Sequence, residues 1–459
     1  MKKIWVKKNA SVLLLFFLSV AISLSFLRES PGRSISLAVL ISTLPLFYLL
    51  TENLSLSFLL FLLLALPFNI TYQLPVSFEK SLVEGISVNY LIPTLSILDF
   101  GIGIFLIILI MKRRKDLKKV WKDYKYPLTF LILFLLFHNI VLRNPLVLLS
   151  SLRIFTYSLT LPILFNQWER EKEQINYKYI SIILLLSVTI QGLLGLSQFL
   201  RGSSMGLNFL GESQGVAGLV GSSFVSLGGE VFLRASGTFP HPNILAGFFL
   251  LALYFAYDIA KKTEKKERLI AYLTMVFSTI FVLFTFSRIT IFLFFLSICV
   301  FLLSRIYLKR KHMSFTLPLL FERFLNIFSL EDSSWIDRIN LAKASFVVIK
   351  NNWILGVGSG NFVKGMEGFS PVTSRSMPLL QPVHNIFLLL FSEIGILGVF
   401  SLGYFLFEIL KKNYKRVTLF GVLIFFSVFV IGMFDHYFVS LPQGEVMFLL
   451  FLFLGVISS

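Results

Sequence analysis

The feature that most constrains the fold is a series of apolar runs, each about as long as one membrane crossing. A helix needs about 20 mostly apolar residues to cross the hydrocarbon core of a bilayer. Because the shortest runs are marginal, we predict an all-α polytopic integral membrane protein with about 12 transmembrane helices. The candidate runs are 10–27, 35–51, 54–71, 90–111, 127–142, 145–165, 178–199, 239–259, 269–287, 289–307, 386–409, 417–434 and 443–458.

Composition excludes the main soluble classes. The 459 residues are 56% hydrophobic and 14% charged, whereas an average soluble domain is about 25% charged. A cytosolic enzyme or a disordered chain is therefore excluded. The single cysteine, Cys299, excludes disulfides within the chain, and the five histidines show no metal-ligand spacing. We expect neither a metal nor another cofactor.

The net charge of +18 is explained by membrane topology, so no nucleic-acid partner is predicted. Basic residues are enriched in cytoplasmic loops of membrane proteins. Four basic clusters are therefore assigned to the cytoplasm: 2–8, 112–125, 261–268 and 411–416. The segments assigned to the opposite face are poor in Lys and Arg: 72–89, 200–238 and 435–442.

These assignments divide the chain into four parts. They are N-terminal transmembrane helices (1–177), further helices with an outer loop (178–312), a large extracytoplasmic loop with short helices (313–385), and C-terminal transmembrane helices (386–459). The topology of 289–330 stays open, because the one candidate for an additional crossing, 313–330, is interrupted by Glu322 and Arg323.

Within the large loop, the stretch 335–350 has the spacing of an amphipathic helix. The residues that suggest one apolar face are Ile336, Ile339, Leu341, Ala344 and Val347 or Val348.

Three arginines on the predicted outer side are candidates for anion binding. Arg234 stands in a loop with almost no other charge, and Arg288 lies between two apolar runs with no acid nearby in sequence. A buried arginine is costly unless it has a partner or access to water. The structural alternatives are lipid contact for Arg234, snorkelling for Arg288 and an ordinary salt bridge for Arg338.

His384-Asn385 precedes a predicted span and is followed, after nine residues, by Gly395-Ile-Leu-Gly398. A neutral imidazole at the water–lipid boundary can accept a proton near pH 7. The structural alternative is that Asn385 starts a helix and the glycines allow close packing. His241 is interpreted as structural, and little is expected of Asp435-His436.

Asp99 and Glu393 are acidic residues inside predicted spans. Such residues mark ion paths in some transporters, but these two show no paired arrangement.

Together these motifs resemble the O-antigen ligase and O-antigen polymerase superfamily of bacterial envelope glycan enzymes. In chain order they are Arg234-Ala-Ser-Gly-Thr-Phe-Pro-His-Pro-Asn243, Thr285-Phe-Ser-Arg288, Arg338 ahead of Trp353-Ile-Leu-Gly-Val-Gly-Ser-Gly-Asn-Phe362, and His384-Asn385 with its gap to Gly395-x-x-Gly398. The resemblance covers roughly residues 180–410.

The resemblance implies a metal-independent, inverting membrane glycosyltransferase at the outer face of the bacterial cytoplasmic (inner) membrane. Its donor would be a glycan on undecaprenyl diphosphate, and its acceptor a hydroxyl of a glycolipid, a glycan or a protein. Arg234 and Arg288 would hold the diphosphate beside the catalytic His384. Arg338 and Asn385 would contact substrate.

Ligase, polymerase and protein oligosaccharyltransferase activities all remain open at this point. A transporter or flippase for lipid-linked glycans is the alternative from another class. A transporter is expected to place polar groups near the midplane, where both faces can reach them.

Overall fold

The computed structural model describes residues 31–74, 78–172, 175–216, 222–227, 230–307, 333–372 and 378–458. The predicted run at 10–27 and the candidate crossing at 313–330, with Glu322 and Arg323, lie outside them. The structure is 75% helical, so the prediction of a mostly helical protein is confirmed.

Six helices of the described residues are long and apolar enough to cross a membrane. They are α2 (Pro31–Thr51), α5 (Arg114–Leu142), α6 (Pro145–Glu171), α7 (Tyr177–Arg201), α8 (Pro242–Lys262) and α14 (Ile386–Asn413). Five further helices are apolar but shorter. The chain is therefore a multi-pass membrane protein, while the number of about 12 crossings stays a prediction.

Every predicted apolar run within the described residues contains a helix, although in the run 90–111 residues 94–96 form a strand and the helix begins at Ile97. The remaining helices are α3 (Leu54–Ala65), α4 (Ile97–Lys112), α9 (Lys265–Leu283), α10 (Arg288–Tyr307), α12 (Ser333–Asn352), α13 (Phe362–Gly365), α15 (Leu419–Phe434), α16 (Tyr437–Ser440) and α17 (Pro442–Ile457). Short 3-10 helices are η1 (Phe78–Ser81), η2 (Asn89–Leu91), η4 (Asn208–Leu210) and η5 (Tyr414–Arg416).

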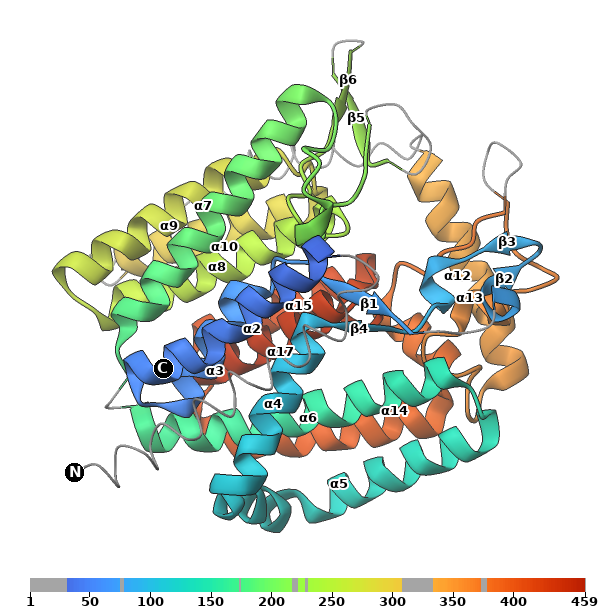
Figure 1. Cartoon of the computed structure of the whole chain (residues 1–459), viewed down its shortest axis with the longest axis horizontal. Coiled ribbons are helices and arrows are strands. Elements are labelled where there is room, and N and C mark those ends of the chain that lie inside the picture. The colour runs from blue at the N-terminus through green and yellow to red at the C-terminus, as the bar shows by residue number, and fades with distance from the viewer. Residues whose placement is uncertain are drawn as a thin grey trace.

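Three two-stranded antiparallel sheets accompany the helices, and the sequence analysis did not predict them. They pair β1 (Thr71–Gln73) with β4 (Thr94–Ser96), β2 (Leu82–Val83) with β3 (Ile86–Ser87), and β5 (Phe224–Leu227) with β6 (Glu230–Leu233). Strands of two to four residues are too short to show an alternating pattern. In Figure 1 β2 and β3 lie at the right beside α12 and α13, β5 and β6 lie at the top, and β1 and β4 lie nearer the centre.

The basic helix ends meet at one pole of the bundle. Arg170 at the end of α6 forms an ion pair of 2.7 Å with Asp116 near the start of α5. Arg416 pairs with Glu169 at 3.3 Å, and Lys262 donates to the carbonyl of Ile457 at 3.0 Å. These contacts join the ends that the charge pattern assigns to one side of the membrane.

Helix α12 confirms the predicted helix at 335–350, and the predicted apolar face is right for Leu341, Ala344 and Val348 but wrong for Ile336 and Ile339. Leu341, Ala344 and Val348 are buried, whereas Ile336 and Ile339 are about half exposed at 52% and 47%. The buried stripe advances by three or four residues from Leu341, as a helix requires. The same spacing towards the N-terminus places Asp337 and Arg338, and not the two isoleucines, on the packed side.

Helix α14 is broken at Gly395, where φ is +60° and ψ is −172°. The backbone groups that lose their helical partners at the break form hydrogen bonds with the glycine-rich turn (353–361) that follows α12. Val357 N donates to Ser392 O at 2.9 Å, Gly358 N to Glu393 O at 2.8 Å, and Ile396 N to Trp353 O at 2.8 Å. Non-helical backbone inside a helix bundle needs such partners, because water is absent there. The turn and the break therefore form one unit.

We predict that Gly395→Ala destabilises the protein by about 2 kcal/mol or more, because a left-handed backbone disfavours a side chain. A Cβ at this position would also lie 2.3 Å from the carbonyl oxygen of Ile354. Thermal unfolding in detergent measures the effect. Gly403→Ala in the same helix is the matched control, since a Cβ there meets nothing within 4 Å. Equal unfolding temperatures for the two variants would contradict the role given to the break.

Candidate functional site

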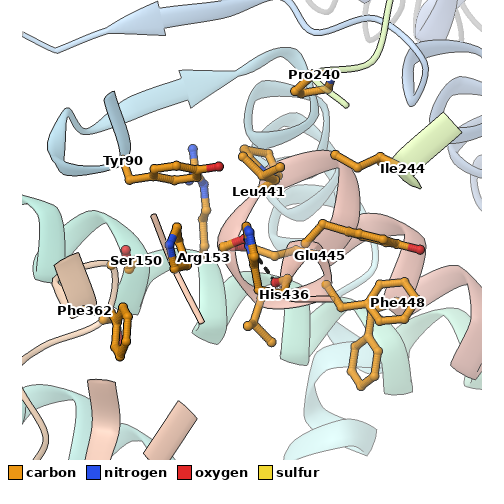
Figure 2. A pocket seen from close by; sticks show the side chains of 18 of the residues that line it. Tyr90, Ser150, Arg153, Pro240, Ile244, Phe362, His436, Leu441, Glu445 and Phe448 are labelled. Atoms are coloured by element: carbon orange, nitrogen blue, oxygen red, sulfur yellow. Dashed lines mark hydrogen bonds between the residues drawn. The ribbon is translucent and has the colours of Figure 1, made fainter. Parts of the chain in front are cut away.

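A cavity of about 1010 Å³ opens among α6, α14, α17 and the loops at the pole opposite the basic ends. His241, His384, Asp435 and His436 line one part of it. Figure 2 shows His436 inside this cavity, with Tyr90, Arg153 and Glu445 around it. Segments separated by more than 200 residues of sequence thus supply one polar wall.

Arg234 is fixed in this site by two hydrogen bonds. Its Nε donates to the carbonyl of Thr285 at 2.8 Å, and its Nη2 donates to Oδ1 of Asn243 at 2.8 Å. The Nδ2 of Asn243 in turn donates to Oδ2 of Asp435 at 2.7 Å. An amide therefore bridges a guanidinium and a carboxylate that belong to different parts of the chain.

The other two predicted arginines lie near Arg234. Arg288 is the first residue of α10, three residues after Thr285, and it is exposed. The guanidinium of Arg338 lies 5.9 Å from the ring centre of Trp335, which itself contacts Phe434 at 6.3 Å between ring centres. The positive charges of Arg288 and Arg338 both lower the pKa of Arg234. The structure therefore brings together the three arginines that the sequence analysis selected.

His384 packs edge-on against His436, with 5.0 Å between ring centres and 85° between ring planes. The Nδ1 atom of His384 is buried and has no hydrogen-bond partner among the described residues. His436 Nδ1 is paired with Ser440 Oγ at 2.6 Å, and its backbone N donates to Oδ1 of Asp435 at 2.8 Å. His384 thus has an uncommitted nitrogen, while His436 is held in place.

Asn385 and His241 both cap helices, which is the structural role that the sequence suggested for them. The side-chain oxygen of Asn385 accepts from the backbone N of Phe387 and of Leu388, each at 3.0 Å. The Nδ1 of His241 accepts from the backbone N of Asn243 at 3.2 Å at the start of α8. Contact of Asn385 with substrate stays a prediction, since its oxygen is engaged within the protein.

Electrostatics keep the imidazoles neutral. Burial is the main cause that lowers the pKa of His384 and of His241, the latter to about 4. Burial also lowers the pKa of Arg234 to about 10; Asp435 opposes this, while Arg338 and Arg288 add to it. Burial alone would raise the pKa of Asp435, but the histidines, which bind protons in acid before Asp435 does, and the hydrogen bond from Asn243 together lower that pKa. At pH 7 the site therefore holds charged arginines, one carboxylate and neutral imidazoles.

Sequence reasoning missed three contributors to the cavity. Asp435 and His436 were given little weight because their short loop carries no motif. Arg153 was overlooked, although an arginine inside the apolar run 145–165 is a signal that could have found it. Its guanidinium lines the cavity and pairs with Asp99, with 2.7 Å between Nη2 and Oδ2.

The described residues contain no group of three or more His, Cys, Asp or Glu side chains arranged to hold a metal ion. The carboxylate of Asp435 is already bonded to Asn243 and to the His436 backbone.

The fold and the site define a class, a multi-pass membrane protein with a polar, arginine-flanked cavity at one pole. Residues 273–403 match a protein-family model described as O-antigen ligase. The predicted resemblance to the O-antigen ligase superfamily is therefore confirmed for this segment, which is less than a third of the chain. The segment includes Arg288, Arg338 and His384 but ends before Asp435 and begins after Arg234. No curated protein matches the chain.

We predict that acidification destabilises the protein through His241. Because burial lowers the pKa of this imidazole from 6.5 to about 4, the unfolded chain binds the proton first, so stability is lost as pH falls below 6.5. His241→Asn keeps a capping side chain but removes this titration. The melting temperature in detergent should fall less steeply between pH 7 and pH 5 in the variant. Parallel curves for variant and wild type would contradict the prediction.

Proposed function

We propose that this protein is a membrane glycosyltransferase of the O-antigen ligase type. It transfers a glycan from an undecaprenyl-diphosphate donor to an acceptor hydroxyl at the outer face of the bacterial cytoplasmic membrane, without a metal and with inversion at the anomeric carbon. The observation that carries the proposal is the placement of Arg234, Arg288 and Arg338 beside a cavity that exposes His384.

The arginines suit a diphosphate leaving group. A guanidinium stays protonated and offers planar, paired donors that match phosphate oxygens. Arg234 is already oriented by Thr285 and Asn243, so little reorganisation is needed when charge develops on the diphosphate. Even with its lowered pKa of about 10, Arg234 remains charged at pH 7.

In the proposed reaction, the oxygen of the acceptor hydroxyl attacks the anomeric carbon from the face opposite the diphosphate. The bond between the anomeric carbon and the diphosphate oxygen breaks, and its electron pair remains on the diphosphate. The hydroxyl proton passes to the imidazole of His384, which lines the cavity. Undecaprenyl diphosphate leaves, and the histidine later returns the proton to water.

The charge distribution supports the proposed side of the membrane. The basic helix ends meet at the pole opposite the cavity, and basic residues concentrate on the cytoplasmic side of membrane proteins. The cavity would then face outwards. This single-sided arrangement also favours a transferase over a transporter, which needs polar groups reachable from both faces.

We predict that Arg234→Lys and Arg288→Lys each lower glycan transfer by about 100-fold, because lysine cannot reproduce the paired donors of a guanidinium. The measurement is surface glycan in cells that lack the native protein and carry each variant. Arg201→Lys is the matched control, since Arg201 is an exposed arginine at the end of α7 that is not among the charges acting on Arg234. Wild-type transfer by Arg288→Lys at normal expression would remove Arg288 from the site.

His384→Ala in the same cells tests the acceptor side of the reaction and the type of enzyme. We expect loss of mature surface glycan, because the hydroxyl proton loses its acceptor. Long chains trapped on the lipid carrier would identify a ligase, and single repeats would identify a polymerase. Normal surface glycan would contradict the role of His384 and favour the transporter.

Transfer by purified protein in detergent is expected to survive EDTA, because arginine side chains supply the positive charge that a metal supplies in other transferases. Product formation is compared with and without the chelator. Loss of transfer on chelation, followed by recovery with Mg²⁺, would contradict the proposed mechanism.

A further inference from the structure

The same cavity has a second polar wall that the proposed mechanism leaves without a role. We propose that this wall, formed by Ser150, Arg153, Ser359, Glu393 and Glu445, binds the ring hydroxyls of a neutral sugar. We call it the sugar wall. The inference rests on the proposed function, and it adds the part of the site that recognises the glycan itself.

The sugar wall joins the glycine-rich turn to the start of α6. A Cβ added at Gly358 would lie 2.6 Å from Cγ2 of Val147, and one at Gly360 would lie 3.4 Å from Oγ of Ser150. Ser359, between these glycines, lines the cavity. Glycine at both positions therefore allows the turn to approach α6 closely enough to form one surface with it.

Ser359 provides an unused hydrogen-bonding group in this surface. Its side chain is only 4% exposed, and its Oγ has no hydrogen-bond partner among the described residues. A buried hydroxyl without a partner destabilises a protein, because its lost hydration is not compensated. A ligand hydroxyl in the cavity would supply the missing partner.

Arg153 contributes donors without a net positive charge. Two of its nitrogens donate to Asp99, Nε at 2.9 Å and Nη2 at 2.7 Å. Tyr157 also donates to Asp99, at 2.6 Å, which fixes the carboxylate. Within the described residues Nη1 of Arg153 makes no hydrogen bond, so a donor remains for a ligand while the ion pair is neutral overall.

Two buried carboxyl groups complete the sugar wall. Glu445, in the first turn of α17, lines the cavity and lies within electrostatic range of Arg153, and its side chain makes no hydrogen bond to the described residues. Glu393, just before the break in α14, is buried and accepts from the backbone N of Phe362 at 3.4 Å. Carboxyl oxygens accept hydrogen bonds from hydroxyl groups.

The cavity therefore separates two kinds of chemistry. Arg234, Arg288 and Arg338 lie near the part of the cavity that is lined by His384 and His436, and their positive charge suits a diphosphate. A neutral ion pair, two buried carboxyl groups and two serines form the sugar wall, which suits an uncharged, hydroxyl-rich ring. This division is what a transferase needs if it is to hold a charged leaving group and a neutral sugar at the same time.

The test compares Ser359→Ala and Glu445→Gln with the wild type in proteoliposomes. The donor is the lipid-linked glycan that accumulates in cells lacking the protein, and the acceptor is the lipid fraction of cells that make no such donor. We expect each variant to lower kcat/KM about tenfold for one substrate, the loss produced by one hydrogen bond to a charged or buried group. The substrate affected shows whether the bound sugar belongs to the donor or to the acceptor.

A second readout separates the sugar wall from the diphosphate site. Binding of undecaprenyl diphosphate, which carries no sugar, should be unchanged in both variants and weakened in Arg234→Lys. Ser278→Ala is the matched control, because Ser278 is also buried with an unpartnered Oγ among the described residues but does not line the cavity. Its kcat/KM should equal that of the wild type.

The outcomes distinguish the two proposals. If the wild type transfers glycan and both variants match it for both substrates, the sugar wall is wrong and the proposed function stands. Weakened binding of undecaprenyl diphosphate in both variants would also overturn the sugar wall, because the residues would then serve the diphosphate. If the wild type transfers no glycan, the proposed function fails and the sugar wall fails with it.

Discussion

The amide bridge between Arg234 and Asp435 is the interaction on which the candidate site depends. Asn243 accepts from the guanidinium at 2.8 Å and donates to the carboxylate at 2.7 Å. It thereby ties the loop before α8 to the end of α15. Both charges are costly in a water-poor setting unless compensated. Asn243 forms a hydrogen bond with each charged group and keeps the two from pairing directly. The guanidinium is therefore oriented but can still bind an anion.

The broken helix α14 positions the second half of the site. Its first residues follow His384, and its break at Gly395 is bonded by the glycine-rich turn that carries Ser359. His138 of α5 adds a hydrogen bond of 3.0 Å between Nε2 and the carbonyl of Leu355 in the same turn. Because the break and the turn complete each other's backbone hydrogen bonds, they form one hydrogen-bonded unit that carries Ser359 and Glu393 of the sugar wall and follows His384.

The sequence predicted the helices well, because a long apolar run in a membrane protein has few other structures available. It also selected Arg234, Arg288 and His384, since each is a polar group in an otherwise apolar or uncharged stretch. The structure brings all three to one pole. The small sheets were missed because their strands are too short to carry a pattern.

Other parts of the site could not be read from local sequence. Asp435 and His436 acquire significance only when α15 ends beside Asn243, a contact across 192 positions. The predicted apolar face of α12 included Ile336 and Ile339 beside Leu341, Ala344 and Val348, but packing buries only the last three. Such choices between two helix faces depend on tertiary contacts, which periodicity alone does not contain.

The most direct test of the central claim is a cryo-electron microscopy structure of the protein in lipid nanodiscs with undecaprenyl diphosphate. The account predicts density for the diphosphate beside Arg234 and Arg288, at the mouth of the cavity that contains His384. Diphosphate density at the opposite pole, among the basic helix ends, or an empty cavity at saturating ligand would contradict it.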